Sequence, residues 1–131
     1  MQVLEIATQG HAQALDITSQ VRRVVEGSGV VEGWAEVYVP HTTAAVAVNE
    51  AADPDVMADV LATLERLVPW QGPYRHGEGN SAAHVKSILV GSSVRLPVSG
   101  GRLALGTWQG VFFMEFDGPR RRKVRVGVSP A

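Results

Sequence analysis

The sequence predicts an α+β fold, a largely antiparallel β-sheet or sandwich with about three helices in the order ββαββααββββ. Two observations predict it. Four β-prone segments follow one another at the end of the chain, so strands there neighbour strands. Helical spacing of apolar residues is confined to three short segments, and these do not alternate with the strands as βαβ crossovers require. A doubly wound parallel sheet is therefore not expected.

The first four elements follow from alternation and turn residues. Residues 2–7 and 12–17 have the pattern of two short strands around a turn, which predicts a hairpin. Thr18 can cap a helix over residues 19–26, in which three valines share one face. In residues 34–39 polar or aromatic side chains alternate with apolar ones, which is typical of a strand buried on one side.

The run VPHTTAAVAVNE lies where the next buried strand is expected, yet it contains polar side chains. In a regular strand these divide between two faces, with His41, Thr43 and Asn49 on one and Thr42 and Glu50 on the other. Three alanines leave little side-chain volume, so another strand, a helix or a ligand must approach closely. Threonines are common in strands, whereas a buried histidine near a glutamate needs partners. The run is therefore a candidate part of a functional site.

Two helices follow this run. Asp53 suits the N-cap of a helix and Pro54 its first position, and apolar residues then keep helical spacing to Leu67. This helix is expected to pack mainly in the core. After a glycine-rich loop, Asn80 or Ser81 can cap the next helix, which ends near a glycine.

Four strands complete the predicted fold, at residues 93–98, 103–105, 111–116 and 123–128. Glu115 interrupts the apolar third strand of this group. A carboxylate there must be paired, hydrated, metal-bound or protonated, because an isolated buried charge costs too much free energy. Glu115 is therefore a second candidate for a functional site.

Length and composition exclude several classes of protein. A chain of 131 residues, 45% of them hydrophobic, can bury one sizeable core, so residues 1–131 are expected to form a single domain. The net charge of -1 gives no general attraction to nucleic acid or membranes. No apolar run approaches the ~20 residues that span a bilayer, and no signal peptide is recognisable. A cytoplasmic protein without nucleic-acid or membrane partners is the expectation.

The chain contains no cysteine, so any metal ion would need histidine or carboxylate ligands. His41, His76 and His84 come from three separate predicted elements. If they converge, they form a metal centre with an open position, or an anion site if some of them are protonated. Each of them is alternatively a structural or an exposed histidine.

The combination of three segments resembles the secondary thiamine-phosphate synthase family over nearly the whole chain. The segments are HTTAAVAVNE, YRHGEGNSAAHVKSILVGSS and GGRLALGTWQGVFFMEFDGPRRRKVRV, and LGTWQ is the most specific of their motifs. The resemblance implies an α+β homotrimer. It also implies a weak transferase activity, which joins a pyrimidine diphosphate and a thiazole phosphate into thiamine phosphate and releases pyrophosphate. The alternative is a non-catalytic trimeric module that binds a metal ion or a phosphorylated metabolite.

On this hypothesis the site binds small phosphorylated metabolites and a divalent ion, zinc or magnesium. The expected catalytic residues are His41, Glu50, His76, His84 and Glu115. The expected substrate-binding residues are Thr42, Thr43, Asn49, Asn80 and Gln109. The expected metal ligands are His41, His76 and His84.

Overall fold

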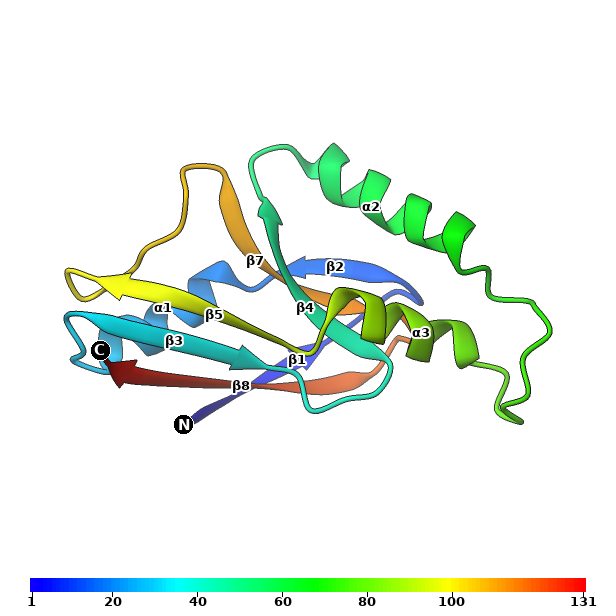
Figure 1. The fold of residues 1–131 in the computed structure, drawn as a ribbon, viewed down its shortest axis with the longest axis horizontal. Helices are drawn as coiled ribbons and strands as arrows, with labels where there is room; N and C mark the ends of the chain where they lie inside the picture. The colour runs from blue at the N-terminus through cyan, green and yellow to red at the C-terminus, as the bar shows by residue number, and fades with distance from the viewer.

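The computed structural model describes all residues from 1 to 131 and confirms the α+β class and the predicted element order (Figure 1). The helices are α1 (Thr18–Gly27), α2 (Pro54–Leu67) and α3 (Ser81–Val90). The strands are β1 (Gln2–Ala7), β2 (Gln13–Asp16), β3 (Gly33–Tyr38), β4 (Ala44–Glu50), β5 (Ser93–Ser99), β6 (Arg102–Leu103), β7 (Gln109–Glu115) and β8 (Arg121–Pro130). None of the three helices has the length and apolar character that crossing a bilayer requires.

The strands form two antiparallel sheets, one of five strands in the order β1-β8-β3-β5-β6 and one of three in the order β2-β7-β4. The main core lies between the sheets and also takes in the buried valines of α1. A second cluster covers the other face of the small sheet, where Phe112 and Met114 pack with Met57 of α2 and Ala83 of α3. Strand β7 is therefore apolar on both faces because it is covered on both.

The predicted hairpin of the first two strands is wrong. β1 pairs with β8 and β2 pairs with β7, so the two strands belong to different sheets. The link between them follows the link between β7 and β8, since Thr8 N donates to Arg120 O and Gly118 N donates to His11 O. The turn residues mark a change of direction here, and they do not specify which strand is the partner.

Two of the three predicted helix caps also differ from the structure. Asp53 caps α2 as expected, because its Oδ1 accepts a hydrogen bond from the Asp55 amide at 2.9 Å. Thr18 is not the N-cap of α1 but its first residue, and its hydroxyl accepts from the Val111 amide at 2.8 Å. Asn80 occupies the N-cap position of α3, but its side chain donates to Asp117 and not to the helix.

The polar run after β3 is not part of a continuous strand. β3 ends at Tyr38 and β4 begins at Ala44, because the chain crosses here from the large sheet to the small one. Val39 N donates to Ser92 O, and Val46 N donates to Gly91 O, so the crossing runs along the junction of α3 and β5. We call residues 39–43 the corner segment. Because the corner segment is not a strand, its side chains do not have to alternate between two faces.

Candidate functional site

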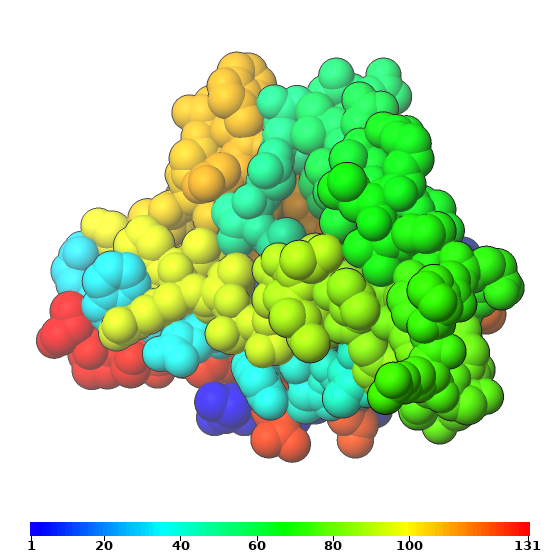
Figure 2. Space-filling view, turned by 45° about the vertical axis from the view of Figure 1, so that its right-hand side comes forward, coloured from blue at the N-terminus to red at the C-terminus, as the bar shows by residue number.

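A pocket of about 470 Å³ lies between the corner segment and α3. In Figure 2 the corner segment, in cyan, lies directly below α3, in yellow-green. The pocket is lined by His41, Thr42, His84, Ser87, Ile88, Gly91 and Ser92. The residues from α3 recur at helical spacing, so a single face of that helix forms one wall.

His41 is held in the pocket as a neutral side chain. Strand pairing between β3 and β8 ends at Tyr38 and Arg125, and the next free amide, that of Lys123, donates to Nε2 of His41 at 2.9 Å. Burial lowers the pKa of His41, and the charge of Arg122 lowers it further. A neutral imidazole that accepts at Nε2 has its proton on Nδ1. His41 therefore offers an N–H donor at Nδ1.

Two hydroxyl groups of the pocket are free to bind a ligand. The side chains of Thr42 and Ser92 are exposed and make no hydrogen bond within the chain, whereas the hydroxyl of Ser87 donates to Ala44 O at 2.7 Å. No carboxylate lines the pocket, and Ile88 is its only hydrophobic residue. The pocket is thus rich in donors.

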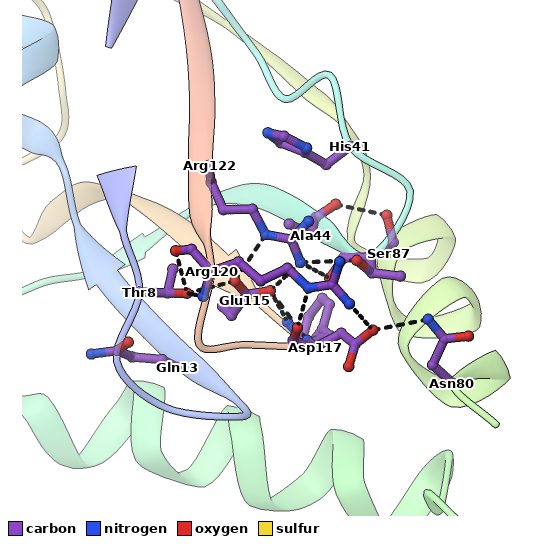
Figure 3. Close-up of polar contacts among 12 residues, drawn as sticks. Thr8, Gln13, His41, Ala44, Asn80, Ser87, Glu115, Asp117, Arg120 and Arg122 are labelled. Atoms are coloured by element: carbon purple, nitrogen blue, oxygen red, sulfur yellow. Dashed lines mark hydrogen bonds and ion pairs between the residues drawn. The ribbon is translucent and has the colours of Figure 1, made fainter. Parts of the chain in front are cut away.

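A buried ion pair lies beside the corner segment (Figure 3). Nε and Nη2 of Arg122 donate to the two carboxylate oxygens of Glu115, and Nη2 also donates to Oγ1 of Thr43 at 2.8 Å. Thr8 donates to the same carboxylate at 2.7 Å. Arg122 and the neighbouring Lys123 amide thus hold both ends of the segment from His41 to Thr43. The hydroxyl of Thr43 is buried in this network, and Thr43 does not line the pocket.

The carboxylate of Glu115 is charged although no part of its side chain reaches solvent. Burial raises the pKa of Glu115, but hydrogen bonds from Arg122, Thr8 and the Asp117 amide outweigh burial and hold the pKa below its usual value. The sequence predicts that a carboxylate at this position needs a partner. Its partner is Arg122, because Arg125 lies on the exposed face of β8.

The three histidines proposed as metal ligands do not form a metal centre. The rings of His76 and His84 lie 5.4 Å apart at 90°, and His84 also lines the pocket with His41, but His76 does not. Nowhere does the chain bring together three or more histidine, aspartate or glutamate side chains that could hold a metal ion. His41 is also unsuited to ligation, since its Nε2 lone pair already accepts the Lys123 amide hydrogen. The prediction that these three histidines form a metal-binding site is therefore wrong.

Three other predicted site residues lie at the far end of the small sheet. Ala44 pairs with Glu115 at one end of the β4–β7 ladder, and Glu50 pairs with Gln109 at the other. Six residue steps separate these ends, about 20 Å of strand. Asn49 lies beside Glu50, so within one chain none of these three reaches the pocket. Asn80 is buried next to Asp117, to which it donates at 2.8 Å.

The sequence did not predict that one face of α3 lines the pocket, nor that Arg122 and Glu115 form a hydrogen-bond network beside it. Ser87, Ile88 and Ser92 gave no chemical signal, because serines and isoleucines are ordinary residues of a helix and its end. Arg122 did carry one: it alternates in phase with Val124 and Val126, which predicts an inward-facing side chain. A larger groove of about 560 Å³ beneath α1 contains none of the predicted residues.

Comparison with known proteins identifies the family. The family model "UPF0047 protein YjbQ-like" matches residues 2–131. The protein YugU of Bacillus subtilis is 47% identical over 93% of this chain and 93% of its own length. The protein MJ1081 of Methanocaldococcus jannaschii is 46% identical over 95% of this chain and 90% of its own length.

Solved structures agree with these relatives. A YjbQ/UPF0047 family protein from Clostridium acetobutylicum, described as an uncharacterized conserved protein, has a TM-score of 0.97 and 48% identity, and the match covers 98% of this chain and 100% of that one. The conserved hypothetical protein TT1486 of Thermus thermophilus has a TM-score of 0.91 and 43% identity, over 98% and 100% of the chains.

These findings correct the resemblance proposed from the sequence. None of the proteins named above is described as a thiamine-phosphate synthase, so the assignment to that family and the transferase activity in thiamine biosynthesis are wrong for this chain. Several motif residues that carried the resemblance have structural contacts instead, as in the ion pair of Glu115 and the amide contact of His41. The chain belongs to the YjbQ-like UPF0047 family.

Proposed function

We propose that the protein binds a small phosphorylated metabolite, with the phosphate group in the pocket between the corner segment and α3. The observation that carries this proposal is the neutral His41, whose Nε2 is taken by the Lys123 amide and whose Nδ1–H is left to donate. A phosphate oxygen accepts such a bond without requiring a charged imidazole. Thr42 and Ser92 add two hydroxyl donors that have no partner within the chain.

Charge and size support the same ligand class. No carboxylate lines the pocket, so an anion meets no repulsion from the wall. The ion pair behind the corner segment is neutral as a unit, and Arg122 is close enough to lower the pKa of His41. A volume of about 470 Å³ lies within the range of pockets for small metabolites. A single phosphate would leave room for an organic group, for which Ile88 provides one apolar contact.

Isothermal titration calorimetry with inorganic pyrophosphate at pH 7 tests the proposal. The parent protein is expected to bind this probe saturably. His41→Met loses the Nδ1–H donor and leaves only the weak sulfur acceptor for the Lys123 amide, and Thr42→Val loses a hydroxyl. A hydrogen bond to a charged group contributes about 1.5–3 kcal/mol, so each variant should bind roughly 10–100-fold more weakly.

His11→Met is the matched control, because His11 is exposed and lies outside the pocket, where its ring meets that of Trp70 edge to face. It is expected to bind the probe like the parent protein. Equal affinities for the parent and both pocket variants would refute the proposed site. Failure of the folded parent protein to bind would refute the proposed ligand class.

A further inference from the structure

The groove of about 560 Å³ beneath α1 shares no residue with the pocket that contains His41. α1 packs against the core-facing side of the large sheet, close to β6 and β8 (Figure 1). The floor of the groove belongs to β8 and to the edge strand β1, and it consists of Leu4, Val126 and Val128. Val126 is fully buried, and the other two side chains pack against the main core. The apolar interior of the protein is therefore open to a ligand at this place.

One stripe of α1 forms the opposite wall of the groove. Its residues recur at helical spacing and are Gln20, Arg23, Val24, Gly27 and Ser28. Val24 extends the apolar floor, whereas the end of the helix contributes only the small residues Gly27 and Ser28. A Cβ atom added at Gly27 would meet no other atom within 4 Å. The end of α1 therefore leaves room for an apolar group between the helix and the sheet.

Arg23 is the only charged side chain that lines the groove. Its Nε donates to Ser19 O at 3.4 Å, and its two Nη atoms have no partner within the chain. The side-chain nitrogen of the neighbouring Gln20 is also free, because only its Oε1 is used, as the acceptor for the Ser19 hydroxyl. A guanidinium with free Nη donors matches the two oxygens of a carboxylate.

The helix dipole argues for a single negative charge and against a phosphate. The groove extends to the C-terminal end of α1, where the carbonyl groups carry partial negative charge. No basic residue in the last turn of the helix balances that charge. A dianion would be repelled there, whereas a monoanion held by Arg23 one turn earlier leaves an uncharged body beside the helix end.

We infer that the groove is a binding site for a carboxylic acid with an apolar hydrocarbon body, the chemistry of a medium-chain fatty acid. The carboxylate accepts from Arg23 and Gln20, and the hydrocarbon lies on the apolar floor and extends towards Gly27. The volume of the groove lies within the range of small-molecule sites. This inference does not depend on the proposed function, because the two sites have no residue in common.

Isothermal titration calorimetry with octanoate, below its micellar concentration, tests the site. The parent protein is expected to bind octanoate saturably, with one molecule per chain. Arg23→Gln should bind about threefold to tenfold more weakly, because the lost charge pair is partly exposed to solvent. Arg22→Gln is the matched control, since Arg22 is exposed and does not line the groove, and it should bind like the parent protein. No saturable binding by the folded parent protein, or equal losses in the two arginine variants, would overturn the inference.

The apolar half of the site has its own tests. Hexanoate is two methylene groups shorter than octanoate and should bind about threefold to tenfold more weakly, because it buries less hydrocarbon. Gly27→Leu places a side chain in the open space of the groove and improves the helix propensity, so octanoate binding should fall at least about tenfold while the Tm does not decrease. Equal affinities for the two acids, or parent-like octanoate binding in Gly27→Leu, would overturn the assignment of the hydrocarbon to this groove.

Discussion

Replacement of Glu115 by glutamine is predicted to destabilise the fold strongly. The change keeps the shape of the side chain but removes the charge that balances Arg122, which is itself buried. The amide cannot replace the carboxylate in either orientation. The Oε2 position accepts from the amides of Phe116 and Asp117, and the Oε1 position accepts from Thr8 and Arg122, so an NH₂ group always faces donors. Removal of one partner from a buried ion pair costs about 3–5 kcal/mol.

The expected effect is large in a thermal melt. With an unfolding entropy of about 2.1 cal/mol/K per residue, each kcal/mol lowers the Tm of a chain of this length by roughly 3–4 °C. Glu115→Gln should therefore melt roughly 10–20 °C below the parent protein in calorimetry or circular dichroism at pH 7. Glu5→Gln is the control, because Glu5 is exposed and lies opposite Lys123 in the sheet. Exposed pairs contribute little, so its Tm should fall by no more than about 3 °C.

A double variant separates loss of the charge balance from loss of shape. In Glu115→Gln/Arg122→Met the unpaired cation is gone, so part of the lost stability should return. A Tm of Glu115→Gln within about 3 °C of the parent protein would refute the buried pair as a main stabilising contact. A double variant less stable than Glu115→Gln would show that the orphaned charge is not the cause.

Three further predictions follow from the fold and the site. Because the pKa of His41 is lowered in the folded state, the contribution of His41 to stability is complete above about pH 6.5 and is lost as the pH falls below that value towards the folded pKa. His41→Gln should therefore flatten the Tm-versus-pH curve below about pH 6.5, and parallel curves would contradict this. In Gly33→Ala the new Cβ would meet Ser129 O at 2.0 Å, so we expect a loss of about 1–3 kcal/mol in urea unfolding, and unchanged stability would contradict the close pairing of β3 and β8. The homotrimer expected from the sequence stays a prediction, and light scattering at micromolar concentration should report three copies and not one.

Most elements of the fold could be predicted because their signals are local. Alternation predicted a strand at residues 34–39, which the structure has at Gly33–Tyr38, and the Asp53-Pro54 pair predicted the start of α2. The partners of β1 and β2 were predicted wrongly, since pairing with β8 and β7 joins positions more than 90 residues apart, and no local turn signal encodes them.

The candidate site was predictable where its signals are local and not where they depend on contacts between distant parts of the chain. The polar run around His41 was recognisable as unsuited to a buried strand, and the structure resolves it into a corner between two sheets. Glu115 was correctly seen to require a partner, but choosing Arg122 over Arg125 needed the phase of β8. Glu50 and Gln109 lie at the far end of the small sheet, because a strand can place two residues of the same sequence motif a full strand length apart. Sequence order alone does not measure that distance.

The location of bound phosphate tests the proposed function most directly. ¹H–¹⁵N NMR spectra recorded during a pyrophosphate titration at pH 7 report on every backbone amide of the protein. We predict saturable shifts at residues 41–43 and 87–92, which form the two walls of the pocket, with little change at Arg23 in the larger groove beneath α1. Shifts centred on Arg23, or no saturable shift at either wall, would contradict the proposed site.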